Sequence, residues 1–387
     1  MKNISKFSQF LFLGFIFFFG CSQEEVDQGS KPFNQPYYNE SEWAALSEEL
    51  FLTLEPHNRD DLARFGRVLF YDKFLSLDGK VSCGSCHNRR LGFGDDQAFS
   101  VGVDGQLTKR NSIALASIPN LGSHYSQSSS SIFASQPALF WDEREKNMSE
   151  QVLNTIENQE ELGISRETLL DLITEKPHYQ VLHSKAFPDS KPQYEDGIEA
   201  IRRFISTIGA ISSEFDEAAI QHLRSHEDIS TSFNTFSINE NRGKDLFLKH
   251  CNSCHGSSFG KRLAIGAEKF PTVANNGLDM NYRDKGVGAV TQIKTHHGVF
   301  KIPSLKNIEL TAPYMHDGRF ETLEQVINFY NEDIQNHINL DHRLKENGLP
   351  KKLEMDDDQK EALVAFLRTL TDDYLIFRHG WSDPFKN

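Results

Sequence analysis

Apolar side chains recur every three to four residues in most segments of this chain that show a regular pattern. That spacing places them on one face of an α-helix, whereas the strict alternation of a half-buried strand is scarce. The last segment is the clearest, because Asp357 can cap its start and Leu363, Phe366 and Leu370 share one face. We therefore predict a mainly α fold, with helices over residues 41–54, 59–71, 144–158, 166–175, 194–212, 240–249, 322–331 and 357–371.

Long stretches rich in Gly, Ser and Asn separate these helices, notably residues 120–135 and 256–288. Loops of that length usually carry function or wrap around a bound group. A weak internal repeat, Gly66-Arg-Val-Leu-Phe70 and Gly243-Lys-Asp-Leu-Phe247, marks the two halves of the chain. We predict two related domains at residues 60–212 and 234–371, with a polar linker at 213–233 and a tail at 372–387.

The composition is that of a globular protein. With 38% hydrophobic and 25% charged residues, the chain is neither disordered nor fibrous, and 387 residues suffice for two domains. The formal net charge of −14 disfavours nucleic acid as a partner. An acidic surface of this kind fits a basic or weakly charged protein partner better.

The N-terminus has the pattern of an export signal. Two lysines precede the apolar run of residues 10–19, which is too short to span a bilayer comfortably, so we predict a signal peptide at 1–20. The run ends at Gly-Cys21, which resembles a bacterial lipoprotein box, although an ordinary signal peptide beside an incidental cysteine is the alternative. We expect a protein of the periplasm or cell envelope, held to the membrane by lipid at Cys21, with a tether and lead-in helix at 21–59.

The other four cysteines form two identical frames, Cys-X-X-Cys-His, at residues 83–87 and 251–255. This spacing suits two thioether bonds to one haem, with the adjacent imidazole binding its iron. A zinc site would need its ligands brought together from distant segments, and a redox cysteine pair would leave both histidines unexplained. We predict two covalently attached haem c groups, one held by Cys83, Cys86 and His87 and the other by Cys251, Cys254 and His255.

Three further motifs carry a resemblance. The chain reads Pro313-Tyr-Met-His-Asp-Gly-Arg-Phe320 after the second frame, and Phe140-Trp-Asp-Glu-Arg144 and Asn158-Gln-Glu-Glu-Leu-Gly163 after the first. Together they closely resemble the bacterial di-haem cytochrome c peroxidase family, in particular its MauG-like members, over roughly residues 60–371. The resemblance implies two cytochrome c-like domains, in which the N-terminal haem reacts with peroxide and the C-terminal haem receives electrons.

The resemblance also assigns roles to single residues. Glu161 matches the distal carboxylate that moves protons during peroxide cleavage, although outside the motif it would pass for a solvated member of an acidic run. Trp141 matches the electron relay between the haems rather than an ordinary core aromatic. Gln151 lies between these two residues on a predicted helix, and we expect it to help shape the peroxide pocket. The family's calcium ion between the domains would be held by Asn111, Thr311 and Pro313.

Two departures from the family pattern bear on mechanism. Many members block the peroxide haem at rest with a histidine, and this chain has Val103 at that position. Because valine cannot bind iron, we predict an open, high-spin first haem, unless His124 is the blocking ligand.

The second departure concerns the distal ligand of the second haem, where typical members have methionine and this chain has Tyr330, as the MauG proteins do. Tyrosinate favours oxidised iron and lowers the potential. Met315 and Met280 are rival ligands, and Tyr330 as a core aromatic is the plain alternative. His316 and Arg319 are expected to line the same pocket.

These features predict an enzyme that reduces hydrogen peroxide to water with electrons from a small cytochrome c or cupredoxin. The second hypothesis is a MauG-like oxidase that uses peroxide to oxidise side chains of a partner protein. A non-enzymatic di-haem electron carrier is the third. A homodimer is possible under each hypothesis.

Overall fold

The first half of the chain is organised around two crossing helices. In the computed structural model, which describes residues 60–116, 139–209, 212–224, 230–259, 262–265 and 272–386, α2 (Asp61–Tyr71) packs along α7 (Tyr194–Thr207). The crossing is close because Gly66 has no side chain, and a Cβ atom there would collide with the carbonyl oxygen of Ala200. The remaining helices of this half are α3 (Cys83–Cys86), α4 (Met148–Glu157), α5 (Arg166–Glu175) and α6 (Pro177–Ala186).

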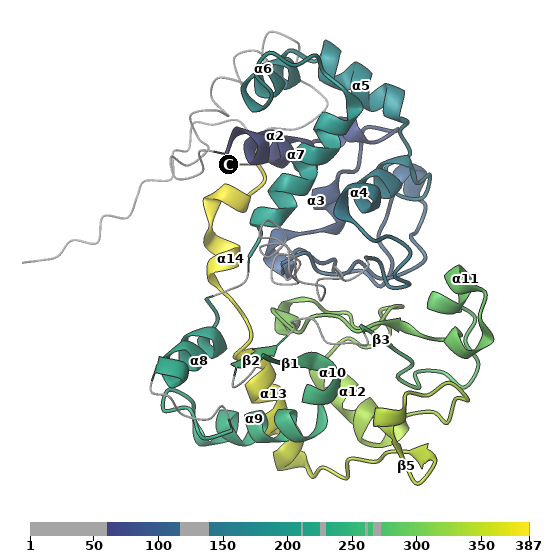
Figure 1. The fold of residues 1–387 in the computed structure, drawn as a ribbon, viewed down its shortest axis with the longest axis vertical. Coiled ribbons are helices and arrows are strands. Elements are labelled where there is room, and N and C mark those ends of the chain that lie inside the picture. The colour runs from purple at the N-terminus through teal and green to yellow at the C-terminus, as the bar shows by residue number, and fades with distance from the viewer. Residues whose placement is uncertain are drawn as a thin grey trace, which may run out of the picture.

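The second half repeats this arrangement. Helix α9 (Ile238–His250) packs along α13 (Asp357–Arg368), and a Cβ atom on Gly243 would collide with the carbonyl oxygen of Ala362. Figure 1 shows the two halves one above the other along the long axis. The other helices are α8 (Glu214–Arg224), α10 (Asn252–His255), α11 (Val287–Thr291), α12 (Leu323–Asn328) and α14 (Tyr374–Phe377).

Strands contribute little, so the predicted mainly α fold is confirmed. Each sheet of the described residues has two antiparallel strands of two to four residues. No helix in the described ranges is long and apolar enough to cross a membrane. The strand pairs are β1 (Gly256–Phe259) with β2 (Arg262–Ile265), β3 (Val273–Ala274) with β4 (Phe300–Lys301), and β5 (Lys345–Glu346) with β6 (Leu349–Pro350).

The structure differs from the expected linker at residues 213–233. Helix α8 occupies much of that stretch, and its Phe215, Ala218 and Ala219 belong to the buried apolar core of the second half. These apolar residues follow Glu214 at helical spacing, so burial against α13 is available to them. This stretch is therefore part of the second domain's packing.

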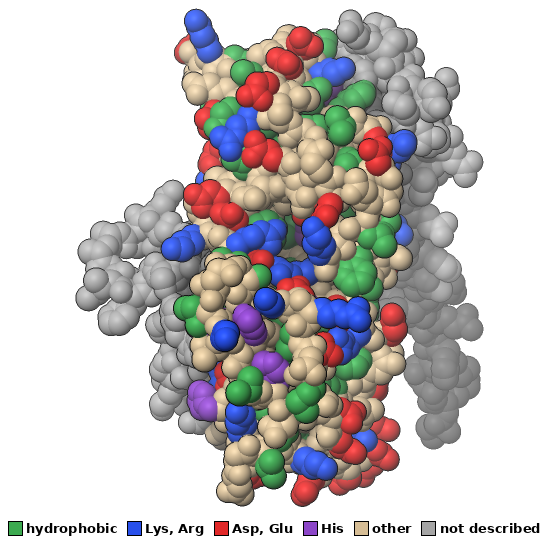
Figure 2. Space-filling model, turned by 90° about the vertical axis from the view of Figure 1, so that its right-hand side faces the viewer, with side chains coloured by type: hydrophobic (Ala, Val, Ile, Leu, Met, Phe, Trp, Pro, Cys, Tyr) green, Lys and Arg blue, Asp and Glu red, His purple; other side chains and the backbone are tan. Residues whose placement is uncertain are grey.

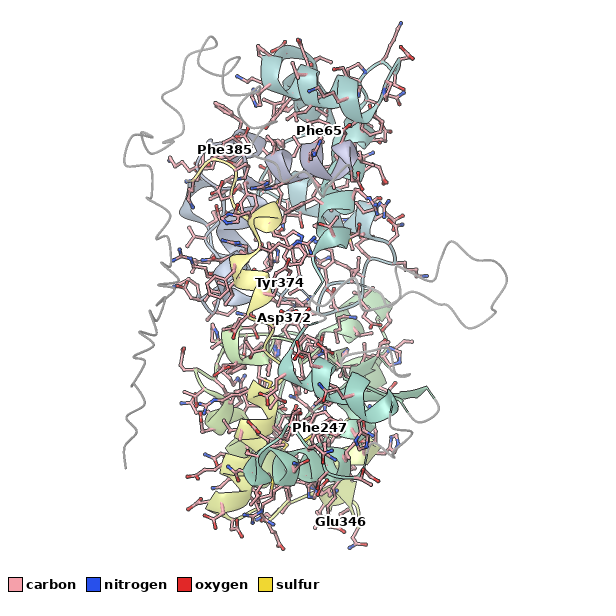
Figure 3. All side chains as sticks on the ribbon, turned by 90° about the vertical axis from the view of Figure 1, so that its left-hand side faces the viewer. Phe65, Phe247, Glu346, Asp372, Tyr374 and Phe385 are labelled. Atoms are coloured by element: carbon pink, nitrogen blue, oxygen red, sulfur yellow. The ribbon has the colours of Figure 1, made fainter. Side chains whose placement is uncertain are left out.

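The expected tail at residues 372–387 also packs. It leaves the second domain at Asp372 and runs back along the first, as Figure 3 shows, and its Leu375, Trp381 and Phe385 join the first apolar core. The Tyr71 hydroxyl donates to the carbonyl oxygen of Trp381 at 2.7 Å. The chain end therefore joins the two domains a second time. The predicted signal peptide, Cys21 and the tether lie outside the described residues.

Candidate functional site

The first Cys-X-X-Cys-His frame forms a single helical turn that starts at Ser82. The side chains of Ser82 and Ser85 bond each other's backbone N–H groups, which caps the four-residue α3. Gly84 lies against the ring of Tyr71, where a larger residue would clash. His87 follows the turn, and its Nδ1 lies 2.9 Å from the carbonyl oxygen of Phe93. Because a carbonyl can only accept, Nδ1 carries the proton and Nε2 is left as a ligand atom.

The second frame has the same geometry at its histidine. Nδ1 of His255 lies 3.2 Å from the carbonyl oxygen of Pro303, so Nε2 is again the free ligand atom. Burial lowers the pKa of His255 to about 4 and also lowers that of His87. Both imidazoles are therefore neutral, which is the form that binds iron.

The cysteines also fit haem attachment. Burial is the main reason that the pKa values of Cys83, Cys86 and Cys251 rise to about 12. Such surroundings oppose the thiolates that zinc requires and suit neutral thioethers. Within the described residues no group of three or more His, Cys, Asp or Glu side chains could hold a metal ion. The donor set therefore favours haem c over the zinc alternative.

A large cavity of about 1150 Å³ opens beside the first frame. His87 is the only His, Met or Tyr among the described residues that line it, so none of them offers a second strong ligand for haem iron. His124, the alternative blocking ligand, falls outside the described residues. The cavity brings together Cys83, Cys86, His87, Asn111, Trp141, Gln151, Thr155, Asn158 and Glu161.

Glu161 lies in this cavity within a hydrogen-bonded group of side chains. Asn158 Nδ2 donates to its Oε1 at 2.8 Å, the Thr155 side chain also bonds its carboxylate, and Gln151 Nε2 donates to Thr155 Oγ1 at 3.3 Å. Burial raises the pKa of Glu161, while these bonds and the charge of Arg144 partly oppose the rise. The carboxyl group is thus set up to exchange a proton above the ordinary carboxylate range.

Val103 lies directly against the backbone of Glu161. It is 1% exposed, and its N–H donates to the carbonyl oxygen of Glu161 at 3.1 Å. The preceding Gly102 is packed so closely that a Cβ atom there would collide with the carbonyl oxygen of Glu160. Val103 therefore supports the loop that carries Glu161 and does not line the cavity.

Trp141 lines the first cavity and also a second, smaller cavity of about 230 Å³ beside the second frame. Its Nε1 donates to the backbone carbonyl of Asn111 at 2.8 Å, and its own carbonyl accepts from the N–H of Lys301 at 2.8 Å. Its ring centroid lies 6.5 Å from that of His316. The indole is thus held by a bond within the first domain, and the backbone of Trp141 by a bond from the second.

Tyr330 and Met315 meet at one amide in the second cavity. Asn276 Nδ2 lies 3.4 Å from the Tyr330 hydroxyl and 3.6 Å from Met315 Sδ. Helix α12 ends at Asn328 and continues as a π-helix over Phe329–Asp333, which carries Tyr330. Burial raises the pKa of Tyr330 to about 12, so only a strong Lewis acid such as haem iron would hold it as tyrosinate.

The other residues predicted for the second pocket differ in whether they line it. His316 lines the cavity and stacks on Phe300 with ring centroids 3.8 Å apart. Arg319 does not: its guanidinium is bound by Asp279 at 2.9 Å and Asp317 at 2.6 Å, at a position exposed to solvent. Met280 is 49% exposed and outside the lining, so it is no rival ligand. Arg319 and Met280 therefore lie outside the described lining of the second cavity, because neighbouring sequence positions do not show which way a loop side chain points.

The three residues predicted to hold calcium all line the second cavity. Asn111 comes from the first domain, while Thr311 and Pro313 come from the second. Asn111 is fixed by its N–H, which donates to the carbonyl oxygen of His316 at 2.9 Å, and by its side chain, which donates to Gln97. The three residues predicted for calcium therefore line one cavity, to which both domains contribute.

Sequence reasoning missed three contributors. Thr155 and Asn276 bond the candidate catalytic and ligand side chains, and Arg110 joins the domains by binding Asp142 at 2.6 Å and Asp284 at 2.6 Å. Gln151 and Thr155 are four residues apart, which could have suggested their contact on one helix face. The Arg110 bridge had no local signal, since Asp284 is 174 residues away.

Two family profiles match consecutive parts of the chain. The profile of di-haem cytochrome c peroxidase matches residues 60–223, and that of cytochrome c matches residues 240–371. The first part contains Trp141 and Glu161, and the second contains Tyr330. The two matched parts correspond to the two repeated helix pairs.

Relatives resemble most of the chain. It is 30% identical over 338 residues to cytochrome c551 peroxidase of Nitrosomonas europaea, covering 86% of each chain. It is 27% identical over 358 residues to the methylamine utilization protein MauG of Paracoccus denitrificans, covering 81% of this chain and 89% of that one. A solved MauG-like protein associated with microbial copper homeostasis has 30% identity and a TM-score of 0.66, covering 84% of this chain and 94% of that one.

Proposed function

The chain belongs to the di-haem cytochrome c peroxidase family, and from that premise we propose that it reduces hydrogen peroxide to water with electrons from a small carrier protein. The site beside the first frame would be catalytic and the site beside the second would receive electrons. One peroxide, two protons and two electrons give two waters, so the protein must deliver both protons and electrons to one cavity.

The contrast between the two cavities is the observation that carries this proposal. The first cavity holds a half-buried carboxylate and, among its described lining residues, no strong iron ligand besides His87. The second holds Tyr330 and Met315 together in the cavity that the frame ending in His255 also lines. A group with one open face suits a reaction with peroxide, and a group with both faces filled suits electron transfer.

When bound beside the first frame, haem c supplies the iron chemistry that breaks the O–O bond. The side chain of Glu161 then takes a proton from one peroxide oxygen and returns it to the other. Asn158 and Thr155 hold the carboxylate in position for both transfers. Trp141, fixed between the cavities, is the side chain through which electrons pass from the second site to the first.

The remaining expectations belong to the same proposal. Export to the periplasm or cell envelope with lipid at Cys21 would place the enzyme where haem c is attached and where small electron carriers are found. A calcium ion held by oxygens of Asn111, Thr311 and Pro313 would stabilise the boundary between the domains. Removing bound calcium with a chelator should then weaken electron transfer between the two sites.

A MauG-like oxidase of a partner protein is the second candidate, and two observations favour it. Val103 replaces the family's blocking histidine, and Tyr330 lies in the second cavity with a hydroxyl that could ligate iron. An enzyme of this kind would accept oxidising equivalents from peroxide without a fast supply of electrons. Identity near 30% to both kinds of relative does not separate the candidates.

The decisive experiment is peroxide titration of the oxidised, haem-loaded protein, followed by turnover with a reduced cytochrome c or cupredoxin. The proposed peroxidase shows a high-spin signal at rest and rapid donor oxidation. A lasting spectral change with negligible turnover would favour the MauG-like oxidase instead. Two low-spin haems with no response to peroxide would reject both enzymes in favour of an electron carrier.

A further inference from the structure

The second domain carries a surface whose charge opposes that of the whole protein. Residues 280–301 contain four Lys or Arg and one Asp, in a chain with net charge −14. This aspartate, Asp284, is already bound by Arg110, so its negative charge does not offset the exposed cations nearby. Figure 2 shows Lys and Arg side chains gathered on this side, at the height where the domains meet. The exposed cations of the segment are Arg283, Lys285 and Lys294.

Apolar side chains are exposed beside these cations. Val290 is 46% exposed and Ile293 is 47% exposed, on α11 and the turn after it. Ile338 is 87% exposed and lies alongside, because Asn339 Nδ2 donates to the carbonyl oxygen of Lys294 at 2.8 Å. Apolar residues gathered within a polar rim are typical of a protein interface. We name this surface the α11 face: Arg283, Lys285, Val290, Ile293, Lys294 and Ile338.

Aromatic rings connect the α11 face to the interior. His337, next to Ile338, contacts Tyr282 with ring centroids 5.1 Å apart, and Tyr282 lies 5.9 Å from Phe300. Phe300 stacks on His316, whose ring lies 6.5 Å from Trp141. Tyr282 also packs in the apolar cluster that contains Tyr330 and Met315. The face therefore lies over the residues assigned to electron transfer.

We propose that the α11 face is the docking surface for a small acidic redox protein with an apolar contact patch. The proposal rests on the proposed function, since the docked protein is the one-electron donor, and two dockings supply the two electrons for each peroxide. Net charge alone favoured a basic partner. At physiological salt, however, charges are screened beyond about 8 Å, so the local cations decide what binds here.

The probe is an acidic plastocyanin, with a basic mitochondrial-type cytochrome c as the comparison. Binding to the haem-loaded protein is measured by calorimetry at low and high salt, and peroxide turnover is measured with each reduced donor. The test variant is Ile293→Asp with Lys294→Glu, which lie outside both cavities. Lys191→Glu, an exposed lysine of the first domain, is the matched charge control.

We expect plastocyanin to bind more weakly as salt rises and the double variant to lose at least about tenfold in affinity and in turnover per donor concentration. The Lys191→Glu variant should stay within about twofold of wild type. Equal binding of plastocyanin to wild type and double variant, or preferred binding of the basic cytochrome that ignores the variant, would overturn the proposal.

Hydroquinone, a small neutral donor, separates this proposal from the proposed function. If hydroquinone drives peroxide reduction equally in wild type and double variant while plastocyanin discriminates between them, both proposals stand. If hydroquinone works and plastocyanin does not discriminate, only the docking proposal fails. Absence of turnover with any donor rejects the peroxidase, and the calorimetric comparison then still decides whether the α11 face binds an acidic protein.

Discussion

The two haem domains share a frame and differ in what faces the bound group. Each domain has a helix pair in which a glycine touches the backbone of the partner helix, Gly66 against Ala200 and Gly243 against Ala362. Each frame also presents a neutral histidine with Nδ1 bound to a backbone carbonyl. The rest of each cavity lining differs, since the first cavity includes Glu161 and the second includes Tyr330 and Met315. The attachment residues are thus alike in the two domains, and the other residues that line each cavity set its chemistry.

The residue after each glycine shows the same division. Arg67 and Lys244 are both buried cations at matching positions of the repeat. Arg67 binds the backbone and hydroxyl of Ser382 in the chain end, while Lys244 donates to the carbonyl of Thr231 at 2.9 Å. The repeated helix therefore supplies a cation in both domains, and each domain uses this cation to hold a different segment.

The largest expected effect comes from removing the carboxylate that distinguishes the first cavity from the second. Glu161→Gln keeps the shape but cannot accept a proton, so peroxide turnover should fall by about 10² to 10⁴-fold while both haems stay attached. In wild type, peroxide turnover should rise with pH as Glu161 loses its proton. The midpoint of this rise should lie above the ordinary carboxylate range, because burial raises the pKa of Glu161. The variant should not show this rise.

Glu160→Gln is the matched control for that variant. Glu160 is next in sequence, but its carboxylate pairs with exposed Lys109 at 2.7 Å and takes no part in the bonds around Glu161. Its turnover should remain near that of wild type. Equal losses in the two variants would mean that Glu161 is not the proton carrier.

The shared frame predicts equal sensitivity at the two glycines. Gly66→Ala and Gly243→Ala each force a methyl group into a partner helix, and each should lower the free energy of unfolding by about 3 kcal/mol. Chemical denaturation of the haem-loaded protein measures the effect. Gly380→Ala serves as the control, since a Cβ atom there meets nothing. Destabilisation by only one of the two core variants would refute the equivalence of the helix pairs.

Tyr330→Phe tests the residue that distinguishes the second cavity from the first. If tyrosinate ligates the second haem, its loss should alter that haem's low-spin spectrum alone and raise its potential by on the order of 0.1 V, since axial ligands tune haem over about 0.8 V. Electron paramagnetic resonance and redox titration measure both effects. Met315→Leu is the companion variant, and a change there with none in Tyr330→Phe would assign the ligand to methionine.

The smallest effects concern two arginines, Arg110 between the domains and Arg319 within the second domain. Arg110→Met removes charged hydrogen bonds to Asp142 and Asp284 in a half-buried position and should cost about 2 kcal/mol of unfolding free energy. Arg319→Met removes a more exposed pair and should cost less than about 1 kcal/mol. Thermal or chemical unfolding compares them. A larger loss of unfolding free energy for Arg319→Met than for Arg110→Met would show that these exposed ion pairs stabilise the protein more than solvent screening allows.

The helix pattern of the sequence was informative where one face is buried. The predicted helix at 357–371 corresponds to α13, and that at 166–175 coincides with α5. The prediction at 144–158 was too long at its start, because Asn147 caps α4 and Glu145 instead pairs with Leu139 in an isolated β-bridge. The linker prediction missed α8, since polar residues on its outer face hid the buried Phe215 and Ala218.

The sequence by itself determined which groups are attached and on what frame, because the spacing of cysteines, histidines and helix-face residues is local and covalent chemistry follows from it. It also placed Glu161, Trp141 and Tyr330 through motifs. Only the tertiary structure decided what surrounds them: Thr155 and Asn158 on the carboxylate, Asn276 between Tyr330 and Met315, and Arg319 turned to solvent. Thr155 lies on helix α4 and bonds Glu161 within the first domain, whereas Asn276 and Arg319 lie in loops of the second domain. Side-chain direction in a loop depends on contacts that sequence spacing does not encode.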